Sequence, residues 1–202
     1  MKRIFILLAV FLISCASVVN YPITLSYSPT KALTKENGGT VAVALLRDKR
    51  TVADKRLIGA KDNKIPFLSL IGEPSGAVSG AFAAYLEDRG FHVQRIGEVW
   101  DGSAGTIRPE WNGLVIGGNL EDFTMTAKTV SLVKTEYTCS IKFFLTFADA
   151  KTKEIRHRER TEVSTSYVTV DFSREKAEQL INSVLAEAVE KALANTGSYF
   201  AK

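Results

Sequence analysis

The sequence predicts an α+β protein: a two-layer sandwich in which a mostly antiparallel sheet of about five strands carries two helices packed on one face. Three long segments near the carboxyl terminus alternate apolar and polar residues, as strands with one buried face do. Two other stretches repeat apolar residues at helical spacing. A short apolar run and a short alternating run supply the remaining strands. In chain order these segments are 40–46, 75–89, 91–96, 113–126, 130–148, 153–170 and 174–195.

The first predicted strand, 40–46, reads Thr-Val-Ala-Val-Ala-Leu-Leu, an apolar run typical of a strand buried on both faces. The polar stretch that follows it, to about Gly72, is expected to be a long loop. The helix over 75–89 carries an apolar stripe and ends before Gly90, which suits a left-handed C-cap. Because this helix leads directly into strand 91–96, the strand–helix–strand order predicts a parallel pair.

Small residues recur at every fourth position along this helix, at Gly72, Gly76, Gly80 and Ala84. A glycine inside a helix costs about 1 kcal/mol relative to alanine, so some close contact should compensate. Two different contacts would explain these small residues. The helix lies very close to its own sheet, or the small-residue ridge packs against a second copy of the chain in a homo-oligomer.

The segments 113–126, 130–148 and 153–170 are expected to form an antiparallel meander, with a hairpin turn at residues 149–152. The helix over about 174–195 is the clearest element, because its apolar residues trace one uninterrupted face. Ser173 is a suitable N-cap for it. The side chains expected to face the core from the three strands are Leu114, Ile116, Leu120, Tyr137, Cys139, Ile141, Phe143, Leu145, Phe147, Ile155, Val163 and Tyr167.

The amino-terminal end has the order of an export signal: Lys2 and Arg3, an apolar run over 4–13, then the small residue Ser14 before Cys15. A helix over 4–13 would be about 15 Å long against a hydrocarbon core of ~30 Å, so it is too short to span a bilayer. A plain secretion signal would favour a small-x-small pattern ending in alanine, which this stretch lacks.

Leu12, Ile13, Ser14 and Cys15 resemble the lipobox of bacterial lipoproteins. The resemblance implies a covalent diacylglycerol and an N-acyl chain on Cys15, and two or more chains give durable attachment to a membrane. Ala16 in the next position, where aspartate would retain the protein in the inner membrane, implies the periplasmic face of the outer membrane.

This signal divides the chain into three parts. Residues 1–14 are the predicted signal peptide, 15–38 a lipidated N-terminus and flexible tether, and 39–202 a single periplasmic α+β domain. Within the tether, Ile23-Thr24-Leu25 could still pack along the domain.

Composition excludes some partners. The net charge of +4 falls to +2 once Lys2 and Arg3 leave with the signal, which is too small to indicate nucleic acid, although 47–56 is a local basic run. Cys15 and Cys139 are the two cysteines of the chain, so a lipid on Cys15 leaves no internal disulfide. The apolar neighbours of Cys139 indicate a buried, unreactive thiol.

The sequence shows no pattern of catalytic residues and none of metal ligands. The two histidines, His92 and His157, lie on predicted strands without other ligands at metal spacing. Glu121 and Asp122 are adjacent on a strand, so they point to opposite faces and cannot act as an acid–base pair. We therefore expect no enzyme, no metal and no cofactor beyond the covalent lipid.

Two groups of side chains are candidates for contact with a partner or an anionic ligand. Arg156, Arg158 and Arg160 share one face of a strand, which is either a solvated face that discourages sheet-to-sheet association or a contact for lipid A, peptidoglycan or phospholipid headgroups. Trp100 and Trp111 flank a loop, where they either cap the edge of the core or form an exposed aromatic rim.

The motifs Asp48-Lys49-Arg50, Ile58-Gly59 and Leu86-Glu87-Asp88-Arg89-Gly90-Phe91 lie between the lipobox and a meander that closes on a long helix. This layout resembles the YajG-type family of bacterial lipoproteins over most of the mature chain. Related folds occur in auxiliary lipoproteins of ABC transporters and in the periplasmic domain of the curli secretion channel. The resemblance implies a location and a fold, and it transfers no catalytic residue.

We therefore expect a non-enzymatic outer-membrane lipoprotein that serves envelope assembly or maintenance through contacts with envelope proteins, peptidoglycan or lipid. The alternative is a periplasmic carrier, or an auxiliary subunit of an envelope transport system, that binds a lipid between helix and sheet.

Overall fold

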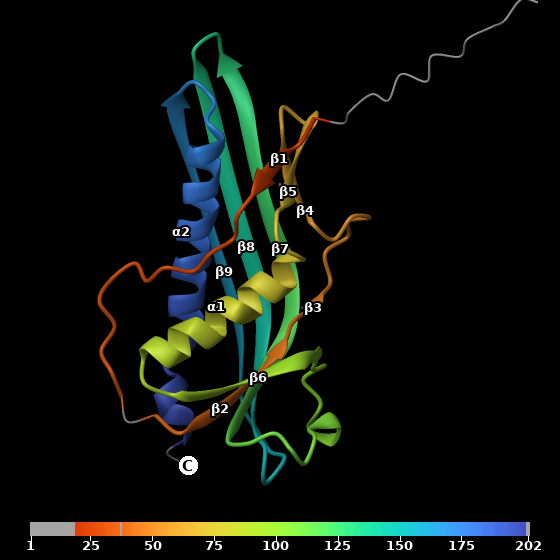
Figure 1. Cartoon of the computed structure of the whole chain (residues 1–202), viewed down its shortest axis with the longest axis vertical. Helices are drawn as coiled ribbons and strands as arrows, with labels where there is room; N and C mark the ends of the chain where they lie inside the picture. Colours follow the sequence, from red (N-terminus) through yellow and green to blue (C-terminus); the bar gives the residue numbers. More distant parts are fainter. Residues whose placement is uncertain (1–18, 37, 201–202) are drawn as a thin grey trace, which may run out of the picture.

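One long sheet is covered on one face by two helices in the computed structural model, which describes residues 19–36 and 38–200 (Figure 1). The elements are β1 (Tyr21–Ile23), β2 (Thr40–Leu45), β3 (Arg47–Asp48), β4 (Leu57–Lys61), β5 (Ile65–Ser69), α1 (Pro74–Asp88), β6 (His92–Val99), the 3-10 turn η1 (Ala104–Thr106), β7 (Leu114–Ser131), β8 (Lys134–Asp149), β9 (Ile155–Val170), α2 (Arg174–Leu193) and the 3-10 turn η2 (Thr196–Phe200).

The sheet is organised around β7. One edge of β7 pairs antiparallel with β8 along nearly its whole length, and β8 pairs antiparallel with β9. Its other edge pairs in parallel with three short strands in turn: β2 at Leu114, β3 at Asn119 and β4 at Met125. Beyond these, β6 pairs with β2, β5 pairs with β4, and β1 pairs with β5.

The predicted sheet was therefore wrong in strand number and in direction. The described residues contain nine strands in one mixed sheet, and five of its eight strand pairings are parallel. The α+β class holds. The error lies in the stretch 47–72, expected to be a loop, which holds β3, β4 and β5. Strands this short have no periodicity of their own. The strands β3 and β4 form on the edge that β7 offers, and β5 forms on the free edge of β4.

The meander itself is confirmed, and the predicted parallel pair is β2 with β6. All the predicted core residues of β7 and β8 are buried on the helix side. On β9, Val163 joins the same core, whereas Tyr167 stacks on Tyr137 but is 37% exposed. The prediction for Ile155 was wrong, because a bulge in the β8–β9 pairing, between Phe147 and Ala148, shifts the register and turns Ile155 to the opposite face.

Both helices begin and end within two residues of the predicted positions. Ser173 caps α2, where its side chain accepts a hydrogen bond from the backbone N–H of Lys176 at 3.3 Å. The small-residue ridge on α1 does not lie against the sheet, since nothing lies within 4 Å of where a Cβ would sit on Gly76 or Gly80. The close-approach explanation of these glycines is therefore wrong, and contact with a second copy stays a prediction.

The segment between the predicted anchor and the domain lies on the domain from Tyr21 onward. Tyr21 pairs with Phe67 in the sheet, and Ile23 is buried in the main core. The chain then crosses α2, where the N–H of Thr24 donates to Glu178 at 2.9 Å and that of Ser26 to Asn182 at 3.0 Å. Packing of Ile23-Thr24-Leu25 along the domain is thus observed, and a flexible tether is not seen over 21–36.

The predicted lipobox, Leu12 to Cys15, and the signal peptide before it lie outside the described residues. Within 19–36 and 38–200, neither helix is apolar enough over a sufficient length to cross a bilayer.

Candidate functional site

The two tryptophans form a small core of their own on the sheet face opposite the helices. Trp100 is 1% exposed and Trp111 6%, and their rings meet edge to face at 6.5 Å. The indole N–H of Trp100 donates to the carbonyl of Ser103 at 3.0 Å. Gly117 provides the flat surface beneath, because a Cβ there would lie 2.8 Å from the Trp100 ring. The indoles therefore cap the core edge, and the exposed aromatic rim is contradicted.

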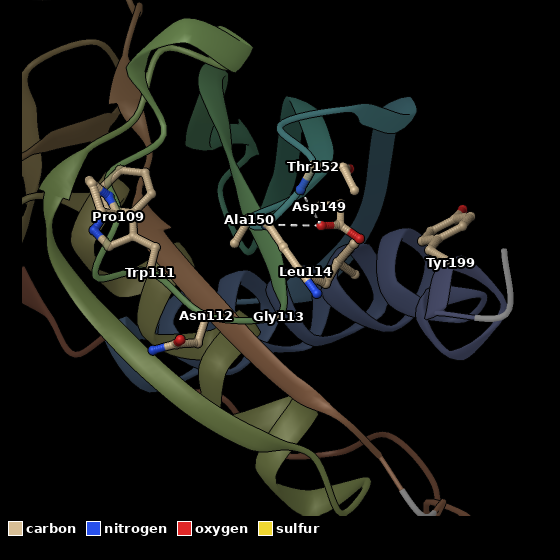
Figure 2. A pocket seen from close by; sticks show the side chains of 10 residues that line it. Pro109, Trp111, Asn112, Gly113, Leu114, Asp149, Ala150, Thr152 and Tyr199 are labelled. Carbon is tan, nitrogen blue, oxygen red and sulfur yellow. Dashed lines mark hydrogen bonds between the residues drawn. The ribbon is translucent and has the colours of Figure 1, made fainter.

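An open pocket of about 510 Å³ lies beside Trp111, at the end of the sheet where β7 begins (Figure 2). Its lining comes from the loop before β7, the β8–β9 turn and the carboxyl-terminal turn. The residues are Pro109, Trp111, Asn112, Gly113, Leu114, Asp149, Ala150, Lys151, Thr152 and Tyr199. Sequence reasoning missed this pocket, because its three segments are distant in the chain.

Asp149 is the acidic group of this pocket. Its carboxylate accepts hydrogen bonds from the backbone N–H groups of Lys151 and Thr152, both at 2.9 Å, and from the guanidinium of Arg156 at 3.0 Å. The Thr152 N–H, together with the other two donors, lowers the pKa of Asp149 against the opposing effect of its partial burial. A carboxylate held ionised by these donors shapes the β8–β9 turn and is a poor proton acceptor.

The three candidate arginines have different surroundings. Arg156 is partly buried against Asp149, while the exposed Arg160 pairs with Glu121 of β7 at 2.7 Å. Arg158 is exposed on the same strand. Since neighbouring carboxylates neutralise Arg156 and Arg160, the arrangement favours a solvated, charge-balanced strand face over a concentrated site for anions.

The basic run 47–56, which was expected to lie in a long loop, includes a buried ion pair. The side chains of Arg50 and Asp48 are 4% and 6% exposed and lie 2.7 Å apart. Arg50 also donates to the carbonyls of Leu57, at 2.7 Å, and Phe123, at 3.4 Å. The pair ties the chain between β3 and β4 to β7. Its signal in the sequence is the Asp48-Lys49-Arg50 motif directly after a buried strand.

Potential metal ligands and nucleophiles are dispersed. His92 is exposed on β6, whereas His157 stacks on Tyr199 at 4.8 Å. Across the described residues, no three His, Cys, Asp or Glu side chains gather as a metal site would require. Cys139 is fully buried, and this burial raises the pKa of its thiol to about 12.

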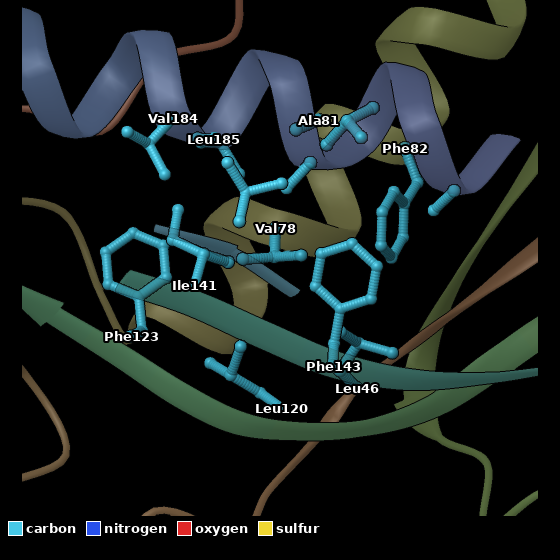
Figure 3. Packing of buried hydrophobic residues seen from close by; sticks show 14 of the residues in the cluster. Leu46, Val78, Ala81, Phe82, Leu120, Phe123, Ile141, Phe143, Val184 and Leu185 are labelled. Carbon is cyan, nitrogen blue, oxygen red and sulfur yellow. The ribbon is translucent and has the colours of Figure 1, made fainter. Parts of the chain in front are cut away.

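The interface between helices and sheet, where the carrier alternative would hold a lipid, is filled by side chains (Figure 3). Phe82 of α1 packs edge to face on Phe143 of β8 at 5.2 Å, and Leu185 of α2 lies over the same strands. All three are 0% exposed. A lipid could enter here only by displacing this core, which would forgo the packing that holds the two layers together.

The fold and these sites define a class of protein: an α+β sandwich with one long mixed sheet, whose polar clusters serve turns and strand connections. No family model matches the chain, and no curated protein matches it.

Several solved structures are similar. A protein of the DUF330 family from Xanthomonas campestris aligns with a TM-score of 0.53 at 11% identity, over 90% of this chain and 95% of that one. A homologue of the neuraminyllactose-binding hemagglutinin from Helicobacter pylori aligns at 0.47 and 14%, over 87% and 97%. A lipoprotein from Neisseria meningitidis aligns at 0.36 and 12%, over 78% and 99%.

The first of these similarities shows a shared fold. The other two scores are below 0.5 and support no further conclusion. The resemblance to YajG-type lipoproteins therefore stays a prediction from the sequence motifs.

Proposed function

We propose that this protein is a non-enzymatic lipoprotein, anchored through acyl chains on Cys15 to the periplasmic face of the outer membrane, where it serves envelope assembly or maintenance. The observation that carries the proposal is Leu12-Ile13-Ser14-Cys15 at the end of an apolar run too short to span a bilayer. Ala16 supports the outer membrane as the destination.

The structure adds support in two ways. Cys139 is fully buried, so it cannot be the partner of Cys15 in a disulfide without disruption of the core. The Asp149 cluster and the Asp48–Arg50 pair hold a turn and a strand connection, which supports structural and not catalytic roles for these groups.

Mass spectrometry of the full-length protein purified from membranes tests the anchor. The expected amino terminus is Cys15, with a mass increase for a diacylglycerol and an amide-linked acyl chain. The variant Cys15→Ser should lose this mass and leave the membrane fraction. Fractionation of the two membranes then tests the predicted destination. Recovery of wild-type protein with an unmodified thiol at Cys15 would contradict the proposal.

A further inference from the structure

The tip of the β7–β8 hairpin is apolar where a turn in water is normally polar. Leu132 and Val133 form the turn, and Leu132 is 102% exposed. Val130 on β7 and Val170 at the end of β9 are also exposed. Lys134 pairs with both Ser131 and Val170, which places the end of β9 directly beside the turn. Contiguous exposed apolar side chains mark a surface that meets another apolar phase.

The opposite end of the same strands has a different character. The β8–β9 turn is built from Asp149 to Glu154, with Lys151, Thr152 and Lys153 exposed. The two turns lie at opposite ends of the long strands (Figure 1). Their exposed residues differ in polarity, apolar at the β7–β8 tip and charged at the β8–β9 turn.

Strand register shows that the amino terminus leaves the domain toward the apolar tip. Tyr21 lies level with Phe67, Phe67 with Gly59 and Gly59 with Met125. Because β1 is parallel to β5, β5 antiparallel to β4, and β4 parallel to β7, the chain before Tyr21 heads in the direction in which β7 runs. That direction ends at Leu132.

The distance from the level of β1 to the hairpin tip is similar to the length of chain between Tyr21 and Cys15. From Met125 to Leu132 β7 and its turn rise about 23 Å at 3.3 Å per residue. From Tyr21 back to Cys15 an extended chain spans at most about 22 Å. Acyl chains on Cys15 therefore cannot hold the domain clear of the bilayer when the tip points toward it.

We propose that Val130, Leu132, Val133 and Val170 form a membrane-contact tip, which enters the interface of the phospholipid bilayer that holds the acyl chains. This inference rests on the proposed lipidation. Apolar contact, and not charge, is the basis of the interaction, because Lys134 and Asp171 flank the tip with opposite charges. The tip and the anchor together fix how the domain stands on the membrane, with the charged β8–β9 turn directed away from it.

A site-specific fluorescent probe tests the tip. The lipidated full-length variant Leu132→Cys is labelled with an environment-sensitive fluorophore and reconstituted into vesicles of phosphatidylethanolamine and phosphatidylglycerol. Cys139 is buried and Cys15 acylated, so the label goes to residue 132. The matched control is Thr152→Cys at the opposite, exposed turn. We expect a blue-shifted emission and severalfold stronger quenching by a quencher carried on the lipid chains at residue 132 than at residue 152.

Three outcomes separate the proposals. Equal quenching at residues 132 and 152 in acylated protein would overturn the membrane-contact tip alone. An unacylated Cys15, seen by mass spectrometry of the same sample, would overturn the proposed function and the tip together. Shielding of residue 132 from aqueous iodide in the unacylated double variant Cys15→Ser, Leu132→Cys, in buffer without detergent or vesicles, would indicate that a second copy covers the tip, and would also overturn it. Replacing Val130 and Val133 with serine should reduce lipid quenching at residue 132.

Discussion

At the scale of single residues, the clearest feature is that buried charge holds a connection between strands. Asp48 and Arg50 face each other below the surface between β3 and β4. Burial by itself would raise the pKa of Asp48, but the hydrogen bonds and charge of Arg50 lower it overall. A buried ion pair adds little net stability compared with apolar residues of similar size. Removal of one partner is nevertheless strongly destabilising, since it leaves the other charged and buried.

Replacement of Arg50 by alanine is therefore expected to lower the free energy of unfolding by about 3–5 kcal/mol. The matched control is Arg56→Ala, which removes the exposed partner of Asp54 and should cost no more than about 1 kcal/mol. Urea denaturation followed by circular dichroism measures both. Similar costs for the two variants would show that the buried pair does not stabilise the β3–β4 connection.

Asp62 predicts a dependence of stability on pH. The Lys61 ammonium and the backbone N–H of Thr129 lower the pKa of Asp62 to about 2. A carboxyl whose pKa is depressed on folding stabilises the native state above its unfolded pKa of ~3.9, and this contribution disappears as the pH falls through the folded pKa. Wild type should thus exceed Asp62→Asn in thermal midpoint at pH 7, with the difference shrinking from pH 4 toward pH 2. A difference that stays constant to pH 2 would contradict this.

At the scale of elements, the described fold depends on the long strand β7, whose one edge pairs with the short strands β2, β3 and β4. The α1 and α2 helices and the three long strands were predicted because each repeats a local pattern for many residues. The strands β1, β3, β4 and β5 were not predicted, since two to five residues carry no measurable period and the partners lie far away in the chain. The bulge that turns Ile155 away from the core likewise arises from pairing.

Two glycines have opposite roles: Gly59 is required by strand pairing, whereas Gly76 only lowers the helix propensity of α1. Gly59 has φ +141°, and a Cβ there would lie 1.7 Å from the carbonyl oxygen of Met125, so Gly59→Ala should cost about 3 kcal/mol or more by forcing β4 away from β7. Gly76→Ala should instead stabilise the protein by up to about 1 kcal/mol, because nothing lies within 4 Å of its Cβ position. Thermal denaturation measures both effects.

The same Gly76→Ala variant tests the predicted contact between copies. Analytical ultracentrifugation of wild type and variant should give different association states if the small-residue ridge of α1 packs against a second copy. Unchanged sedimentation of a self-associating protein would contradict a role of Gly76 in that contact.

At the scale of the whole molecule, the amino-terminal segment belongs to the fold as much as the carboxyl-terminal helix does. Near the end of α1, Arg89 donates to the carbonyl of Leu193 at 3.2 Å and pairs with Glu36, so three distant parts of the chain meet around one guanidinium. The path from β1 across α2 to Glu36 therefore acts as a strap that joins the sheet to both helices.

Ile23→Ala should accordingly cost about 2–5 kcal/mol, the range for removal of a buried aliphatic side chain, because Ile23 is 1% exposed in the main core. The control Val19→Ala, at a residue 64% exposed, should change the free energy of unfolding by less than about 0.5 kcal/mol. Equal stabilities of the two variants in urea would show that residues 21–36 are held only loosely.

Local patterns in the sequence determined the α+β class, both helices, the meander and the prediction of an anchor at Cys15, because helical and strand periods and a processing signal are contained in contiguous residues. Tertiary structure alone decided that Trp100 and Trp111 are buried, that Arg50 and Asp48 form an internal pair, and that the nine strands of the described residues share one sheet. It also placed the apolar hairpin tip at the end of the sheet from which the chain enters β1 at Tyr21. These features depend on which distant segments pair with β7, and no local pattern in the chain encodes that choice.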